Sequence, residues 1–206
     1  KKYVVKQPFG NLAEHFEDFN NHVQIYCSTK KEDKEDIQNF AKQFNVPLDD
    51  IIPTSDFIVV PHGLTHDFGI VMEKAGETAE SILKKKMPDE NRILIILKVL
   101  FVLAYLDKKG WDHGDAHGKN IMLDQNGNVK LIDFGFTMKK NNNTNRWFNG
   151  SAATFVQSMR LFGYDRLFSY NFPSVTQRLD EALVLIKEIS KDQKITGQKP
   201  LPDQPD

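Results

Sequence analysis

Three oxygen-bearing side chains lie in two short glycine-containing stretches in the middle of the chain. Asp115 and Asn120 belong to HGDAHGKN (residues 113–120), and Asp133 opens DFG after the apolar run VKLI. Carboxylate and amide oxygens are the ligands that Mg²⁺ prefers, so Asn120 and Asp133 could hold a divalent cation. Asp115, near the start of the same loop, could orient a hydroxyl group and accept its proton. These residue types suit the transfer of a phosphoryl group from a nucleotide.

The segments that follow the loop predict the element that positions these residues. IML (residues 121–123), DQNGN (124–128) and VKLI (129–132) come one after another. Asn-Gly between two short apolar runs is a strong signal for a β-hairpin. The hairpin would bring Asn120 and Asp133, which flank it, to the same end, and Asp115 would lie just beside them.

The rest of the chain predicts a mixture of helices and strands. The segment ILIILKVLFVLAYL (93–106) is apolar on nearly every face and shorter than the roughly 20 residues that span a bilayer, so we predict a buried helix from Pro88 to about Gly110. KAGET (74–78) breaks the preceding strand and is a candidate hinge. Periodicity predicts further helices over 12–26, from the charged cluster KKEDKED through Phe44, and over 78–86, 151–162 and 175–189. Strands are predicted over 3–6, 56–60 and 68–73. The composition predicts a flexible tail over 194–206.

The composition argues against several classes of site. The 206 residues include 27 basic and 28 acidic side chains, so no general field draws the protein to nucleic acid or to an anionic membrane. Cys27 is the only cysteine, which excludes an intramolecular disulfide and a metal site of several thiolates. A reducing compartment suits this composition best: the cytoplasm, or a host cytoplasm for a viral or effector protein. No pattern in the sequence indicates an oligomeric state.

The order His113, Asp115, Asn120, hairpin and Asp133-Phe134-Gly135 resembles the catalytic core of the protein-kinase-like superfamily. The resemblance is strong over residues 113–135 and weaker from Tyr3 to about Leu167. It implies an α+β, bilobal fold, with a small N-lobe over 1–74 and a mainly helical C-lobe over 75–193. It also implies ATP and Mg²⁺ as cofactors, Asp115 as the catalytic residue, and Asn120 and Asp133 as metal ligands.

The same resemblance implies further contacts with the nucleotide. Lys6, which ends YVVK, matches the lysine that contacts the phosphates, although a lysine there could also be merely solvated. Its partner is expected on the next helix, where Glu14 and Glu17 are available and we select Glu17. Backbone groups near Glu73 and Ala75 are expected to contact the adenine. His117 is expected either to face the phosphates or to pack within the loop.

The sequence also departs from ordinary serine/threonine kinases. Those kinases carry Arg where Gly114 stands and Lys where His117 stands, and the loop here resembles that of aminoglycoside phosphotransferases and choline kinases. No glycine-rich loop precedes Lys6 within the five residues before it. We therefore expect a protein serine/threonine kinase, with a catalytically weak interaction module and a small-molecule kinase as alternatives. Only about 70 residues follow Gly135, which is short for a dedicated small-molecule pocket. Of the two substrate classes, proteins are therefore favoured over small molecules.

Overall fold

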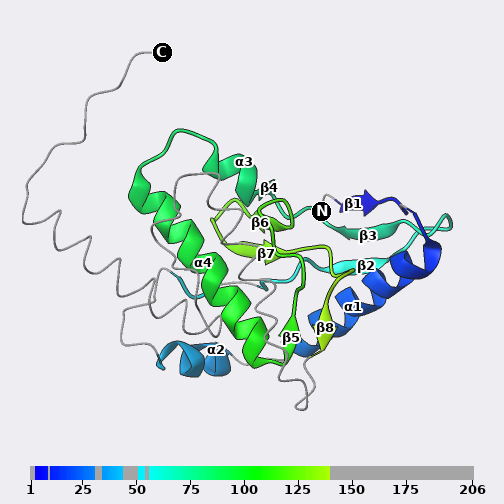
Figure 1. Ribbon diagram of the computed structural model, residues 1–206, viewed down its shortest axis with the longest axis horizontal. Coiled ribbons are helices and arrows are strands. Elements are labelled where there is room, and N and C mark those ends of the chain that lie inside the picture. The colour runs from blue at the N-terminus through cyan, green and yellow to red at the C-terminus, as the bar shows by residue number, and fades with distance from the viewer. Residues whose placement is uncertain (1–2, 9, 31–33, 44–50, 54–55, 140–206) are drawn as a thin grey trace, which may run out of the picture.

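The computed structural model describes residues 3–8, 10–30, 34–43, 51–53 and 56–139. Within these ranges the chain is a mixture of helices and antiparallel strands, which confirms the predicted α+β class (Figure 1). The helices predicted over 151–162 and 175–189, and the tail over 194–206, lie outside the described residues. The helices are α1 (Leu12–Lys30), α2 (Lys34–Ala41), α3 (Ala79–Leu83) and α4 (Asp89–Lys108).

One sheet is formed near the N-terminus by three strands in the order β1-β3-β2. These strands are β1 (Tyr3–Lys6), β2 (Pro61–Leu64) and β3 (Ile70–Glu73), and both pairings are antiparallel. The register places Lys6 opposite Ile70 and Tyr3 opposite Glu73. Lys6 therefore leaves the sheet at the end of β1, from where its long side chain can reach other elements.

The strand predicted over 56–60 is wrong, because the strand β2 begins only at Pro61. The apolar residues Phe57, Ile58 and Val59 are buried, but they pair with β7 through a single parallel bridge at Leu131 rather than with a neighbouring strand of the first sheet. Val59 N–H donates to the Leu131 carbonyl, and Leu131 N–H donates to the Phe57 carbonyl. The apolar run thus reflects burial between two parts of the fold.

A second sheet contains the predicted hairpin. Its strands are β4 (Glu77–Thr78), β6 (Ile121–Leu123) and β7 (Val129–Leu131), and Ile121 pairs with Leu131. The carboxylate of Asp124 accepts hydrogen bonds from the backbone N–H groups of Asn126 and Asn128, which closes the turn. A further pair of two-residue strands, β5 (Trp111–Asp112) and β8 (Met138–Lys139), brackets the loop and the DFG segment.

Helix α4 forms the centre of the larger core, as predicted from its apolar faces. Every side chain from Val99 to Leu106 is buried, and the same cluster includes Ile25 of α1, Phe40 of α2 and Leu131 of β7. A second, smaller cluster of Val59, Ile70, Met72 and Ala75 lies under the first sheet. No helix among the described residues is both long and apolar enough to cross a membrane.

Helix α1 buries a polar face. The sequence places Leu12, Phe16, Phe19, Val23 and Tyr26 on one apolar stripe of this helix, but Leu12 is exposed and the other four are only partly buried. The fully buried positions include instead His15, Asp18 and His22, spaced three and four residues apart on one side of the helix. Because buried polar groups need partners, this face must meet other polar groups of the molecule.

Candidate active site

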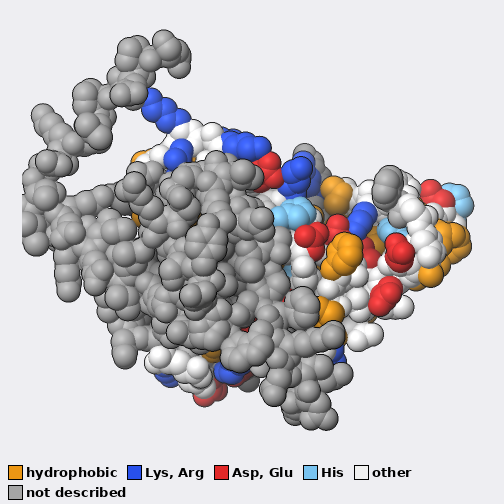
Figure 2. All heavy atoms as spheres, in the orientation of Figure 1, with side chains coloured by type: hydrophobic (Ala, Val, Ile, Leu, Met, Phe, Trp, Pro, Cys, Tyr) orange, Lys and Arg blue, Asp and Glu red, His pale blue; other side chains and the backbone are white. Residues whose placement is uncertain are grey.

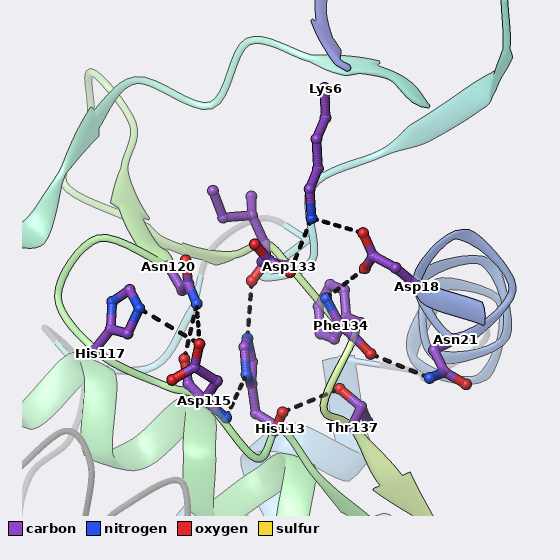
Figure 3. Close-up of polar contacts among 11 residues, drawn as sticks. Lys6, Asp18, Asn21, His113, Asp115, His117, Asn120, Asp133, Phe134 and Thr137 are labelled. Carbon is purple, nitrogen blue, oxygen red and sulfur yellow. Dashed lines mark hydrogen bonds and ion pairs between the residues drawn. The ribbon is translucent and has the colours of Figure 1, made fainter. Parts of the chain in front are cut away.

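The loop between β5 and β6 joins Asp115 to Asn120. The Asn120 side-chain N–H₂ donates to the Asp115 carbonyl at 2.9 Å and to the Asp115 carboxylate at 3.1 Å (Figure 3). These bonds orient the amide nitrogen toward Asp115, so the amide oxygen remains available to a cation. Ile132 N–H donates to the Asn120 carbonyl at 3.1 Å, which fixes the loop to the far strand of the hairpin.

His117 lies beside the carboxylate of Asp115. Its Nε2 is 3.4 Å from Asp115 Oδ2, and its Nδ1 accepts a hydrogen bond from Lys119 N–H at 3.2 Å. With Nδ1 accepting, Nε2 carries the proton and points it toward Asp115. The structure therefore places His117 next to the expected catalytic carboxylate, and its predicted contact with phosphates stays a prediction.

His113 supports the loop from below. It is fully buried, its Nε2 donates to the Ile132 carbonyl at 2.9 Å, and its Nδ1 faces the Asp115 N–H at 3.4 Å. Burial lowers the pKa of His113, so the ring is neutral at neutral pH. A neutral ring with one donor and one acceptor matches both of these backbone contacts.

Gly114 sits between His113 and Asp115 in a backbone conformation that favours glycine. Its φ is +78°, and a Cβ built there would lie 2.1 Å from the Phe136 carbonyl oxygen. The position that carries Arg in the kinases compared above therefore has no room for a side chain here.

Lys6 connects two carboxylates from distant segments. Its Nζ is 2.7 Å from Asp18 Oδ2 and 2.9 Å from Asp133 Oδ1 (Figure 3). Burial lowers the pKa of Lys6, but hydrogen bonds to Asp18 and Asp133 outweigh that effect, so the net pKa is raised and the amine is charged. The predicted pairing with Glu17 is wrong. Glu17 is exposed, because it lies one residue, or about 100° of helix rotation, from the buried Asp18.

Helix α1 also holds the residue that follows Asp133. Phe134 N–H donates to Asp18 Oδ1 at 2.8 Å, and Asn21 Nδ2 donates to the Phe134 carbonyl at 3.1 Å. The buried Phe134 ring lies between the rings of His22 and His113, with centroids 4.8 and 5.0 Å away. Asp133 itself has φ of 65°, which is unusual for a residue with a side chain and marks a strained backbone at a candidate functional position.

The segment predicted to contact the adenine links the two sheets. Glu73 ends β3, Ala75 is buried, and Gly76 precedes β4 with φ of +115°. The Glu73 carboxylate is 2.7 Å from Nζ of Lys130, whose side chain is only 11% exposed. The structure thus shows an ionic role for the Glu73 side chain that the sequence did not reveal, and the adenine contacts stay a prediction.

The donor set suits a magnesium ion carried by a nucleotide. Asn120 contributes an amide oxygen and Asp133 a carboxylate whose side chain is 37% exposed. The described residues contain no group of three or more His, Cys, Asp or Glu side chains that could form a complete metal cage. Mg²⁺ is commonly held by one or two protein oxygen ligands together with phosphates and water, so these residues fit that cation.

The site opens to the surface. In Figure 2, acidic, basic and histidine side chains stand side by side on the molecular surface, in the region where β1, β2 and β3 lie in Figure 1. Asp115, His117 and Asp133 are all partly exposed, whereas Asp18, His22 and His113 beneath them are buried. The side chains that a ligand could reach thus rest on a layer of buried polar residues.

Sequence reasoning missed Asp18 and Asn21, and it assigned no role to His22. The available signal was the spacing of polar residues His15, Asp18 and His22 along α1, which places them on one face beside the apolar stripe. A polar face at helical spacing is ordinarily solvated, and only the fold shows that it is buried against Lys6 and Phe134.

Comparisons with known proteins agree with this geometry. The family model of the protein kinase domain matches residues 21–160. The eIF-2-alpha kinase GCN2 of Schizosaccharomyces pombe is 33% identical over 96 residues, which cover 45% of this chain and 6% of that protein. The serine/threonine-protein kinase shk2 of the same organism is 33% identical over 79 residues, or 37% of this chain and 13% of that protein.

A plant relative matches a shorter stretch. The serine/threonine-protein kinase RUNKEL of Arabidopsis thaliana is 39% identical over 54 residues, which cover 26% of this chain and 4% of that protein. Each match therefore spans only a small part of the relative. The family model, however, covers more than half of the chain, and its match includes the loop, the hairpin and DFG. The chain belongs to the protein kinase domain family.

Proposed function

We propose that the protein is an ATP- and Mg²⁺-dependent protein serine/threonine kinase. The observation that supports this most strongly is the meeting of three segments of the chain: the loop in which Asn120 contacts Asp115, the end of β1 with Lys6, and Asp133 of DFG, which pairs with Lys6 (Figure 3). Turn-forming residues would not need to meet a lysine more than a hundred residues away. A charged lysine between two carboxylates is also a group that nucleotide phosphates can recruit.

Each residue has a role in this proposal. Asp115 orients the acceptor hydroxyl and accepts its proton, while the neighbouring His117 contacts the phosphates. Asn120 and Asp133 would hold Mg²⁺, which neutralises charge on the phosphates when it is bound. Lys6 contacts the phosphates, and the adenine contacts backbone groups near Glu73 and Ala75.

The preference for protein acceptors rests on the relatives. The names of shk2 and RUNKEL state that they are serine/threonine-protein kinases. We also propose the two-lobed arrangement, with the N-lobe over 1–74 and the C-lobe over 75–193, and a cytoplasmic location, which the single cysteine favours.

The test is transfer of label from γ-labelled ATP in the presence of Mg²⁺ to generic protein acceptors and to the protein itself. Wild type is compared with Asp115→Asn and Asp133→Ala, and Glu17→Ala serves as a control on an exposed acidic residue. Label on serine or threonine that disappears in both site variants and persists in the control supports the proposal. An absence of both transfer and ATP-dependent thermal stabilisation overturns it, and stabilisation without transfer favours the interaction module.

A further inference from the structure

Helix α2 packs against the end of α4 that lies nearest β5 (Figure 1). Asp36 of α2 accepts a hydrogen bond from the Tyr105 hydroxyl at 3.0 Å and forms an ion pair with Lys109. Lys108 is 3.7 Å from the other oxygen of the same carboxylate. Hydrogen bonds from Lys109 and Tyr105 lower the pKa of Asp36, so the carboxylate is ionised at neutral pH.

An aromatic contact reinforces this attachment. The Phe40 ring is 2% exposed and lies 5.5 Å from the ring of Phe101 and 5.4 Å from that of Tyr105. Lys108 Nζ lies 5.1 Å from the centre of the Phe40 ring. One face of α2 therefore contacts α4 through both charge and apolar packing.

The attachment of α2 to α4 also restrains α1, because only three residues of the chain separate the end of α1 from the start of α2. Ile25, in the C-terminal half of α1, is fully buried in the same core cluster as Phe40 and α4. The end of α1 that is remote from Leu12 is thus fixed to α4 by its own buried side chain and by the helix that follows.

The position of Asp18 depends on how α1 is held. Asp18 precedes the end of α1 at Lys30 by twelve residues, which corresponds to about 18 Å of helix. At that distance a tilt of a few degrees at the base moves Asp18 by about 1 Å, which breaks hydrogen bonds of 2.7 and 2.8 Å to Lys6 and Phe134. A small tilt at the C-terminal end of α1 is therefore enough to displace Asp18 from its partners in the site.

We propose that α2 is a positioning element for phosphoryl transfer, and that Asp36 is a positioning residue that acts on the reaction through Asp18. This inference rests on the proposed kinase function. The contacts of Asp36 are with Tyr105, Lys108 and Lys109 of the helix α4 region, so it acts on the site only indirectly. It anchors the base of α1, so that Asp18 meets Lys6 and the backbone of Phe134 without help from another molecule.

The test compares Asp36→Ala with Glu35→Ala, which changes the neighbouring, exposed acidic residue of the same helix. We expect Asp36→Ala to lower kcat about tenfold, because displacements near 1 Å reduce catalysis strongly. KM for the protein acceptor should change little, and Asp36→Glu should restore part of kcat. Should Asp36→Ala fail to fold, Asp36→Asn keeps an acceptor for the Tyr105 hydroxyl and replaces it in the comparison.

The dependence on Asp18 is tested in an Asp18→Ala background. If Asp36 acts through Asp18, the Asp36 substitution causes no further loss of kcat there. An equal loss in both backgrounds, or no loss in either, overturns the proposal. A purely structural role would lower kcat independently of Asp18.

Hydrogen exchange tests the same proposal without requiring activity. In Asp36→Ala, backbone amides of α1 and of residues 133–135 should exchange faster, whereas those in the middle of α4 should not. Unchanged exchange in α1 overturns the positioning role. Because this measurement needs no phosphate transfer, an inactive wild type would contradict the kinase function while leaving the positioning role to be decided by exchange.

Discussion

Replacement of Asp18 tests the part of the site that joins the N-terminal sheet to DFG. In Asp18→Ala, the buried Phe134 N–H loses its acceptor, and Lys6 keeps only Asp133 as a partner. Glu17→Ala is the matched control, because Glu17 precedes Asp18 directly and is exposed.

The magnitude follows from these two losses. An unsatisfied buried N–H costs about 1–3 kcal/mol. The ion pair adds roughly 1 kcal/mol, since Lys6 is one-third exposed and solvent screens the interaction. We therefore expect the free energy of unfolding to fall by about 2–4 kcal/mol, or roughly 5–15 °C in Tm for a chain of this size. We expect kcat to fall about a hundredfold, because Asp18 no longer holds Lys6 and the DFG backbone in a fixed position relative to each other.

Asp18→Asn separates the two roles of the carboxylate. The amide oxygen can still accept from Phe134 N–H, so most of the stability should be retained, whereas the loss of charge should still lower kcat. Urea unfolding measures the first effect and label transfer at saturating ATP measures the second. If Asp18→Ala matches both wild type and Glu17→Ala in stability and rate, the reasoning is refuted.

Three other predictions concern buried groups around the site. Burial lowers the pKa of His22 and of His113, so as the pH falls below about 6.5 these rings take up protons in the unfolded chain before they do so in the folded one. Their contribution to stability is therefore fully present above about pH 6.5. Below that pH the free energy of unfolding should fall by up to about 1.4 kcal/mol per pH unit for each ring. Urea unfolding at pH 7 and pH 5.5 measures this, His22→Gln should flatten the dependence, and equal stability at both pH values would contradict it. Glu73→Ala leaves the buried Lys130 unpaired and should cost about 3 kcal/mol of unfolding free energy; adding Lys130→Met should recover most of it, and no recovery would exclude the ion pair as the cause. Gly114→Ala should lower Tm and kcat together, since its Cβ would overlap a backbone carbonyl; a wild-type Tm would show that the loop shifts freely.

The sequence predicted the parts of the site that local patterns determine. Asn120 and Asp133 flank a hairpin whose turn residues are adjacent in the chain, so their meeting required only the Asn-Gly turn and two apolar runs. The apolar segment that became α4 was similarly clear, because a helix that is apolar on nearly every face is expected to lie in a protein core. Local patterns placed these elements well.

The sequence could not predict which residue of α1 meets Lys6. That contact depends on the rotation of the helix about its axis, which the packing of Ile25 and the hydrogen bond from His22 to the Val59 carbonyl determine. The apolar stripe suggested a different buried face. The sequence favoured Glu17, whereas the tertiary contacts bring the neighbouring Asp18 to Lys6. The missed ion pair of Glu73 with Lys130 has the same origin, since it joins residues 57 positions apart.

The departure at Gly114 is explained by how the segment after DFG is held. In kinases with arginine at this position, the arginine pairs with a phosphorylated loop, which fixes that loop by charge. Here other contacts hold residues 134–139: the Thr137 side-chain hydroxyl donates to the His113 carbonyl at 3.2 Å, and the backbone of Trp111 pairs with that of Lys139 across β5 and β8. Gly114 permits the close approach that these contacts need, because any Cβ would separate the two segments. Gly114 thus lacks a side chain that could contact a phosphate, and its close approach to Phe136 lets the fold itself position the start of this segment.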